Sequence, residues 1–305
     1  MFSPVDCGLA GYQALGRRFA SSFVWALILS LVIAVPAGLG LWASRDMIQQ
    51  MFLHDAGTEP HMRAALHFHA VNQVMVGWTL AAQTLFVLAV EAAVMRAILR
   101  PKQPGGLFWL KFGGDELRLL IVRHVHGLLF ILFLLLGGAL VAGLAIAAHS
   151  ANAVLGAVVG WGGAALLVAL TIWLWVRLSL AGAISVKERR LSLFDTFATT
   201  RGRFWSLLFA YVVAGMLSGA TMLLILSVTA VGVLGALAAT GHLAALQAVQ
   251  NLFVSPPPPE TLTAAAVAGG VWIYVSSWAS VVGLAVTAAP GASAVDALRT
   301  TDRIA

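Results

Sequence analysis

Six long apolar stretches fill most of this 305-residue chain, and each is long enough to cross a lipid bilayer as a helix. A helix needs about 20 apolar residues to span roughly 30 Å of hydrocarbon, and there it satisfies its own backbone polar groups. The runs are continuous rather than alternating, which excludes a closed β-barrel. We therefore predict an all-α polytopic membrane protein with six transmembrane helices. Their ranges are 19–43, 70–95, 119–148, 153–185, 204–239 and 263–289.

The composition agrees with this class. Hydrophobic residues make up 60% of the chain and charged residues only 10%, whereas an average soluble domain is about a quarter charged. A water-soluble fold could not bury so much apolar side chain. The formal net charge is +6, and anionic headgroups attract each membrane-proximal Lys or Arg by about 1 kcal/mol. We therefore expect membrane lipids, with anionic headgroups at the cytoplasmic face, as partners and no nucleic acid.

The basic residues fall almost entirely on one side of these helices. Short loops rich in Lys and Arg stay cytoplasmic, so the asymmetry predicts a bacterial inner-membrane protein with both termini in the cytoplasm. Only Arg45 and Arg63 lie on the opposite side, and Arg177 lies within a span. The fifteen residues on the basic side are Arg17, Arg18, Arg96, Arg100, Lys102, Lys111, Arg118, Arg123, Lys187, Arg189, Arg190, Arg201, Arg203, Arg299 and Arg303.

The order of the spans predicts a single six-span domain, residues 1–305, built from three helical hairpins. The connection at residues 149–152 is so short that the third and fourth helices must be adjacent and antiparallel. Phe, Leu and Trp mixed with Arg and Lys favour an interfacial amphipathic helix before each hairpin. The hairpins are expected at about 19–98, 119–185 and 204–289, the lead-in segments at 8–19, 108–120 and 191–204, and a cytoplasmic tail at 290–305.

A polar stripe runs along the second predicted span. At about 100° per residue, its members fall within roughly a third of the helix circumference, and Trp78 faces the other way. Polar side chains are costly against lipid, so the stripe should face the bundle interior or a hydrated cavity. It either bonds neighbouring helices or lines a path for a substrate. The stripe consists of His69, Asn72, Gln73, Gln83, Thr84 and Glu91.

Glu91 needs a cationic partner if it is ionised within the membrane. Arg177 is the preferred candidate, because each residue lies about nine or ten positions from a cytoplasmic basic residue, which implies equal depth. Arg96 points away from Glu91 on the helical wheel. Further candidates for ion pairs at the same level are Asp115, Glu116, Arg118 and Arg123.

No catalytic, metal-binding or cofactor-binding motif is present. The sequence has no GxSxG elbow, no Walker loop and no HExxH pair. Cys7 is the only cysteine, which excludes an intramolecular disulfide and a cysteine zinc site. His67 and His69 are two residues apart, so they point to opposite helix faces instead of sharing one ion. We expect a protein that is not an enzyme and holds no metal or cofactor.

Two segments resemble parts of known bacterial membrane proteins. Residues 186–208 read VKERRLSLFDTFATTRGRFWSLL, an amphipathic stretch and basic turn that feed a new span. They resemble the repeated element of the superfamily that includes the glycerophosphoryl diester phosphodiesterase membrane domain. Residues 91–120, with Phe112-Gly-Gly-Asp-Glu-Leu-Arg, resemble uncharacterised proteobacterial inner-membrane proteins. Catalysis in that superfamily belongs to a separate soluble domain, and this chain has no His-Arg-Gly motif. The resemblance therefore implies membrane location and fold without hydrolase activity.

Two classes of function remain open. The polar stripe favours a protein that transports or binds a small or amphipathic solute or a lipid. Short loops and small-residue surfaces favour a membrane scaffold or accessory subunit without transport activity, acting as a homo-oligomer or with a partner membrane subunit. Two GxxxG pairs, Gly156 with Gly160 and Gly215 with Gly219, allow close helix contacts inside one protomer or between protomers.

The charge asymmetry gives a direct test of topology. Reporter fusions after Arg100 should behave as cytoplasmic, whereas fusions after Asn152 and Glu260 should behave as external, because the short basic loops stay inside. The proline tract at residues 256–259 should lie outside with Glu260. Cytoplasmic reporter activity after Glu260 would contradict the orientation.

Overall fold

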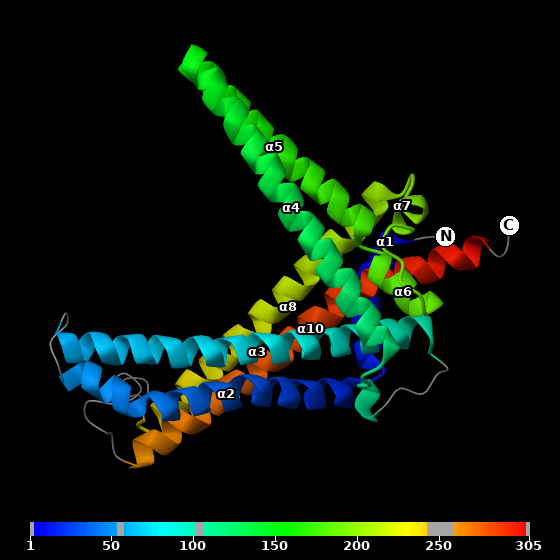
Figure 1. Ribbon diagram of the computed structural model, residues 1–305. Helices are drawn as coiled ribbons and strands as arrows, with labels where there is room; N and C mark the ends of the chain where they lie inside the picture. The colour runs from blue at the N-terminus through cyan, green and yellow to red at the C-terminus, as the bar shows by residue number, and fades with distance from the viewer. Residues whose placement is uncertain (1–2, 54–57, 102–106, 243–258, 303–305) are drawn as a thin grey trace. The chain divides into compact units, whose positions relative to one another are not determined.

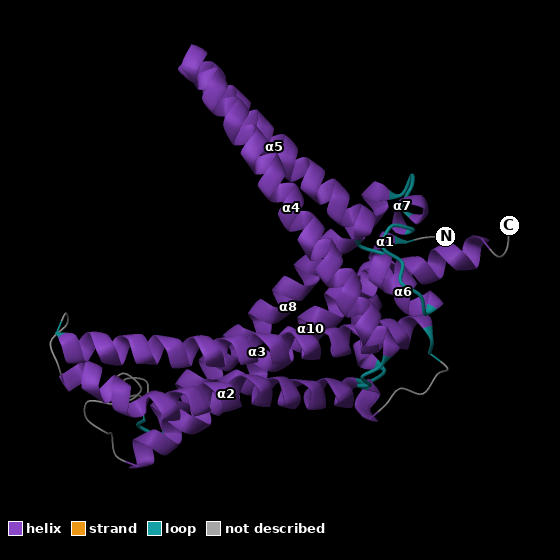
Figure 2. Ribbon diagram, viewed as in Figure 1, coloured by secondary structure: helices purple, strands orange, loops and turns teal. Residues whose placement is uncertain are grey.

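The computed structural model describes residues 3–53, 58–101, 107–242 and 259–302. All regular structure in these ranges is helical (Figure 2), which confirms the predicted all-α class. Lys102, Arg303 and the first three prolines of the 256–259 tract lie outside the described residues. The elements are α1 (Pro4–Gly16), α2 (Phe19–Leu53), α3 (Glu59–Leu99), the 3₁₀ turn η1 (Leu107–Trp109), α4 (Gly114–Ala151), α5 (Ala153–Leu178), α6 (Ala181–Glu188), α7 (Thr196–Thr199), α8 (Phe204–Ala239) and α10 (Pro259–Asp302).

Six of these helical segments are long and apolar enough to cross a membrane, so the chain is an integral, multi-pass membrane protein. Most are longer than the hydrocarbon requires: α3 has 41 residues, which at 1.5 Å each makes about 60 Å. The helices therefore continue past the apolar stretches into their polar flanks. The candidate spans are Phe19–Ile48, Glu59–Leu99, Gly114–Ala151, Ala153–Glu188, Phe204–Ala239 and Pro259–Leu298.

The chain divides into two compact units. The first unit comprises Met1–Ala14, Glu91–Gly215 and Val286–Ala305. The second unit comprises Leu15–Val90 and Met216–Ala285. The helices α3, α8 and α10 each contribute one part to each unit, and the last two residues of α1, Leu15 and Gly16, belong to the second unit.

Aromatic contacts hold α2 against α10 in the second unit. The rings of Phe23 and Trp278 stack with centroids 5.3 Å apart. The indole nitrogen of Trp278 donates to Ser22 Oγ at 3.1 Å, and the Tyr274 hydroxyl donates to the Phe23 carbonyl at 3.4 Å. The two tethers join residues about 250 positions apart. They satisfy polar tips that would otherwise be unpaired in an apolar setting.

In the first unit, α4 and α5 form the antiparallel hairpin that the short connection predicts (Figure 1). Asn152 lies between the two helices and is the N-cap of α5. Its side-chain oxygen accepts from the backbone N–H of Val154 at 2.7 Å and of Leu155 at 3.3 Å. Such an N-cap satisfies the free amides at the start of a helix. A Cβ added at Gly163 would lie 2.8 Å from Val141 Cγ1. The close approach of α4 and α5 therefore depends on glycine.

The two GxxxG pairs differ in their surroundings. Gly156 faces the His149 backbone across the α4–α5 turn, where an added Cβ would meet its Cα at 2.7 Å. A Cβ at Gly215 or Gly219 would meet nothing within 4 Å. The first pair therefore serves packing inside the protomer, while the second lies on an open face of α8.

Several expected boundaries differ from the structure. The first lead-in segment is a separate helix, α1, but residues 114–120 already belong to α4, and the third lead-in contains only the short α7. The expected tail at 290–305 begins inside α10, which continues through Pro290 to Asp302 and buries Val295 and Leu298. Hydropathy marks where apolar residues stop, whereas a helix continues as long as its backbone bonds and packing persist.

Candidate functional site

The polar stripe of α3 lies largely on an exposed face. The side chains of His69, Asn72, Gln73 and Thr84 are exposed, and Gln83 is half-buried. Gln73 Nε2 lies 3.4 Å from His69 Nε2, and the Thr84 hydroxyl donates to the Leu80 carbonyl of its own helix at 2.8 Å. These four exposed side chains are therefore not packed in the interior of the helix bundle, which was one of the two expected settings. The other, a hydrated cavity, stays a prediction.

The reason is that a helical wheel groups residues by face without showing which face packs. Trp78, opposite the stripe, is 70% exposed as well. Along this part of α3 the buried residues are few, with Ala64 at 4% and Phe86 at 6%. Only a narrow face of α3 packs against other helices in this part of the chain, and it includes neither the polar stripe nor the face that carries Trp78.

Glu91 does have an arginine partner from another helix, but it is Arg123 and not Arg177. Arg123 Nη1 on α4 donates to Glu91 Oε2 at 2.8 Å. The Glu91 side chain is 19% exposed and that of Arg123 is 55% exposed. The preference for Arg177 was wrong because similar depth does not make two helices neighbours, and α4 is the helix beside Glu91.

A charge cluster joins the end of α3 to the start of α4. Arg96 pairs with Glu116 and lies 3.7 Å from Asp115. Arg100 and Arg118 each reach Asp115 at 3.1 Å. Apart from Arg118, these side chains are at most 13% exposed. We call Arg96, Arg100, Asp115, Glu116 and Arg118 the charge cluster.

The charge cluster also satisfies backbone groups nearby. Arg96 donates to the Trp109 carbonyl at 3.1 Å, and Arg100 donates to the Val186 carbonyl in α6. Glu116 accepts from the Gly113 N–H at 3.0 Å, as the third residue of a helix does in a capping box. Its carboxylate also complements the positive end of the α4 dipole. These contacts give the cluster a structural role, joining α3, α4 and α6.

Arg177 lies in the last turn of α5. Its Nη1 donates to the Phe197 carbonyl at 3.2 Å and to Thr200 Oγ1 at 3.1 Å, and its guanidinium lies 5.5 Å from the Trp173 ring centroid. No carboxylate of the described residues lies within ion-pair distance of it. Arg177 therefore differs from the cations of the charge cluster.

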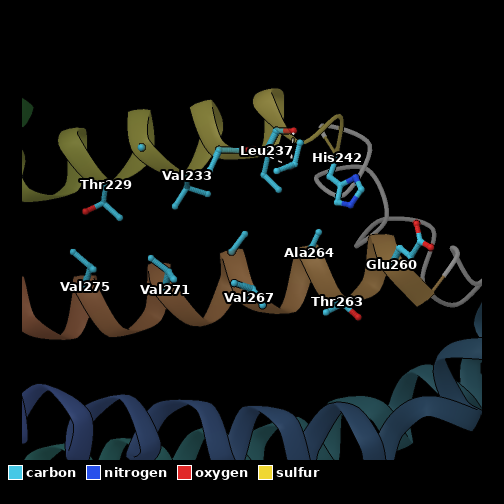
Figure 3. Close-up of a pocket in the computed structure, with 14 residues that line it drawn as sticks. Thr229, Val233, Leu237, His242, Glu260, Thr263, Ala264, Val267, Val271 and Val275 are labelled. Carbon is cyan, nitrogen blue, oxygen red and sulfur yellow. Dashed lines mark hydrogen bonds between the residues drawn. The ribbon is translucent and has the colours of Figure 1, made fainter.

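An apolar groove of about 810 Å³ lies between α8 and α10 in the second unit (Figure 3). Aliphatic side chains such as Val233, Val267 and Val271 line its length. Gly232 and Ala268 are also part of its wall, and side chains this small leave the space open. The groove was not predicted from the sequence. The small residues in these two spans are the feature that could have indicated it.

The groove is polar at one end, where α8 stops and α10 begins. Gly241 adopts a φ of 74°, which favours glycine. The N–H of His242 then bonds the Leu237 carbonyl at 2.8 Å, closing the helix in a Schellman arrangement. Pro259 and Glu260 begin α10. Proline suits this position because the first N–H groups of a helix have no partner within the helix, and a carboxylate there is stabilised by the positive end of the helix dipole. His242 and Glu260 therefore line the same end of the groove.

Outside the spans, Cys7 of α1 is buried. Burial raises the pKa of its thiol, a hydrogen bond from Ser293 of α10 lowers it, and the nearby Asp6 carboxylate raises it further. A thiol held neutral in this way is a packing group rather than a nucleophile. Among the described residues, no group of three His, Cys, Asp or Glu side chains is placed to hold a metal ion.

Comparison with known proteins gives no relatives: no protein-family model matches the chain, and no curated protein or solved structure matches it. The resemblance to the phosphodiesterase membrane-domain superfamily stays a prediction.

The charge cluster gives a stability prediction. Glu116→Leu should lower the free energy of unfolding by about 3–5 kcal/mol, because it leaves Arg96 buried without its carboxylate. Adding Arg96→Leu should recover much of that loss. The measurement is unfolding of the purified protein in mixed micelles, followed by tryptophan fluorescence.

Glu59→Leu is the matched control. The Glu59–Arg63 pair is about three-quarters exposed, so its loss should change stability by less than about 1 kcal/mol. The changes in unfolding free energy caused by Glu91→Leu and Arg177→Leu should add in the double variant, because these two side chains are not in contact. Equal effects of Glu116→Leu and Glu59→Leu would show that the cluster does not stabilise the fold.

Proposed function

We propose that this chain is a non-enzymatic membrane protein that binds an amphipathic molecule of the lipid class in the groove between α8 and α10. The observation that carries the proposal is a long apolar groove whose ionisable lining residues, His242 and Glu260, lie at one end (Figure 3). Thr229 lines the other end, and its hydroxyl donates to the Ile225 carbonyl of its own helix at 2.8 Å. Its volume of about 810 Å³ is within the roughly 300–1,000 Å³ usual for ligand sites. An acyl chain fits the aliphatic walls, and a headgroup fits the polar end.

The polar end favours a headgroup that carries an amine. Glu260 supplies a carboxylate, and Thr240 and Thr263 are also among the lining residues there. A carboxylate pairs with an ammonium group and repels a headgroup with only negative charge. Packing against lipid tails gives little preference in a bilayer, where every chain is equally apolar. Selectivity would therefore come from the headgroup, and phosphatidylethanolamine is a suitable probe.

Binding has better support than transport along α3. The stripe residues do not line the groove, and four of the six are exposed. The proposed location is the bacterial inner membrane with cytoplasmic termini, which the distribution of Lys and Arg supports. In that orientation the polar end of the groove lies on the external side.

A tryptophan placed in the groove should displace the lipid. Val233 lines the groove, whereas Val231 on the same helix is 72% exposed and is not among the lining residues. Val233→Trp should reduce retained phosphatidylethanolamine at least about fivefold by native mass spectrometry, because the indole fills the acyl-chain space. Val231→Trp should retain lipid like the wild type. Equal retention by both variants would refute the groove as the site.

A membrane scaffold is a second candidate, and the exposed amides of α3 favour it. Asn72 and Gln73 lie within an apolar span and are exposed. Amides in such a position bond most favourably to a neighbouring helix. A second copy of the chain, placing its own stripe opposite, would supply those partners.

Cysteine cross-linking tests this candidate. In a Cys7→Ala background, Val76→Cys lies two turns from His69 on the stripe face, and Trp78→Cys lies on the opposite face. Oxidation should cross-link the Val76→Cys variant into a dimer and leave the Trp78→Cys variant monomeric. Adding Asn72→Leu and Gln73→Leu should reduce the dimer several-fold. A monomeric Val76→Cys variant would argue against self-association through α3.

A further inference from the structure

Arg177 is a cation in a membrane helix with unfilled hydrogen-bonding capacity. Both of its hydrogen bonds to the described residues leave from Nη1. Its Nε is buried without an acceptor, as are those of Arg96 and Arg100. A guanidinium has five N–H donors and stays charged at any physiological pH. The other buried arginines of the first unit, Arg96 and Arg100, have carboxylates. Arg177 has protein acceptors but no counter-charge among the described residues.

The segment beside Arg177 adds positive charge. Thr200, which accepts from Arg177, is followed by a tight turn in which the Arg203 N–H bonds the Thr200 carbonyl at 3.2 Å. Gly202 allows this turn with a φ of 73°. Arg201 is exposed and Arg203 is half-buried in the same turn. Neither forms an ion pair with a described carboxylate.

The nearest acidic residue of this segment is already engaged. Asp195 pairs with Arg190 at 2.8 Å and accepts from the Ser192 hydroxyl at 3.1 Å. Two exposed indoles flank the region, with Trp173 at 41% and Trp205 at 77%. Tryptophan is enriched at the level of lipid headgroups. The region therefore combines three arginines with two exposed aromatic side chains.

We propose that Arg177, Arg201 and Arg203 bind the phosphate of an anionic phospholipid. Thr200 is fully buried and its hydroxyl already donates to the Thr196 carbonyl at 2.8 Å, so its part is to position Arg177. The planar guanidinium gives two parallel hydrogen bonds to phosphate oxygens, which an ammonium group cannot do. The flanking tryptophans favour a phosphate attached to acyl chains over one free in water. This site belongs to the first unit and is independent of the α8–α10 groove, whose acidic end favours the opposite headgroup charge.

The test is binding of short-chain phosphatidylglycerol to the full-length protein in neutral detergent. Arg177→Gln should weaken this binding about tenfold, and Arg177→Lys should recover only part of it, because lysine keeps the charge without the bidentate geometry. Arg45→Gln is the matched control, since it removes one positive charge from an arginine whose carboxylate partner is its neighbour in sequence. That variant should bind like the wild type.

A second variant covers the case in which Arg177→Gln fails to fold. Arg201→Gln with Arg203→Gln changes only the turn and should weaken phosphatidylglycerol binding several-fold. Val233→Trp should leave it unchanged, which separates this site from the groove. Wild-type binding by both arginine variants would overturn the proposal. Inorganic phosphate that competes as well per molecule as the lipid would show a soluble-anion site and refute the lipid assignment.

Discussion

The absence of water from the hydrocarbon core is the constraint on which this structure depends. Every backbone N–H and C=O at that depth must bond within the protein, and a continuous helix does this alone. Accordingly, Pro36 and Pro290 lie inside helices without ending them. Positive φ angles within the described chain are found outside the long helices, at Phe108, Trp109, Arg189, Gly202 and Gly241. Sites that include loop or helix-cap residues, such as the His242 end of the groove, therefore lie at the ends of the spans.

Charge follows the same logic as the backbone. A buried guanidinium or carboxylate loses its hydration, so it persists where an opposite charge and further hydrogen bonds replace water. The charge cluster meets this condition, with Asp115 and Glu116 shared among Arg96, Arg100 and Arg118. Arg177 meets it only in part, because its acceptors are a carbonyl and a hydroxyl. That difference separates a residue with a structural role from one suited to an external anion.

A helical wheel drawn from the sequence groups residues by helix face, but it does not show which helix packs against which face. The helical wheel predicted that Arg96 is not the partner of Glu91, and the two residues do bind different side chains of α4, Glu116 and Arg123. It could not show that α4 lies beside Glu91 or that His69 and Asn72 would be exposed. The groove was missed for a similar reason: small and aliphatic side chains leave a cavity only where two particular helices lie beside each other, here α8 and α10.

The sequence by itself determined the class of protein, because length and hydropathy decide whether a helix can replace water with its own hydrogen bonds. It also determined the α4–α5 hairpin, since the connection at Asn152 leaves no other arrangement. Only the tertiary structure decided the partner of Glu91, the charge cluster, the neutral acceptors of Arg177 and the groove ending at His242 and Glu260. Each of these features depends on which helices are neighbours. Contacts between residues far apart in the chain decide which helices pack together.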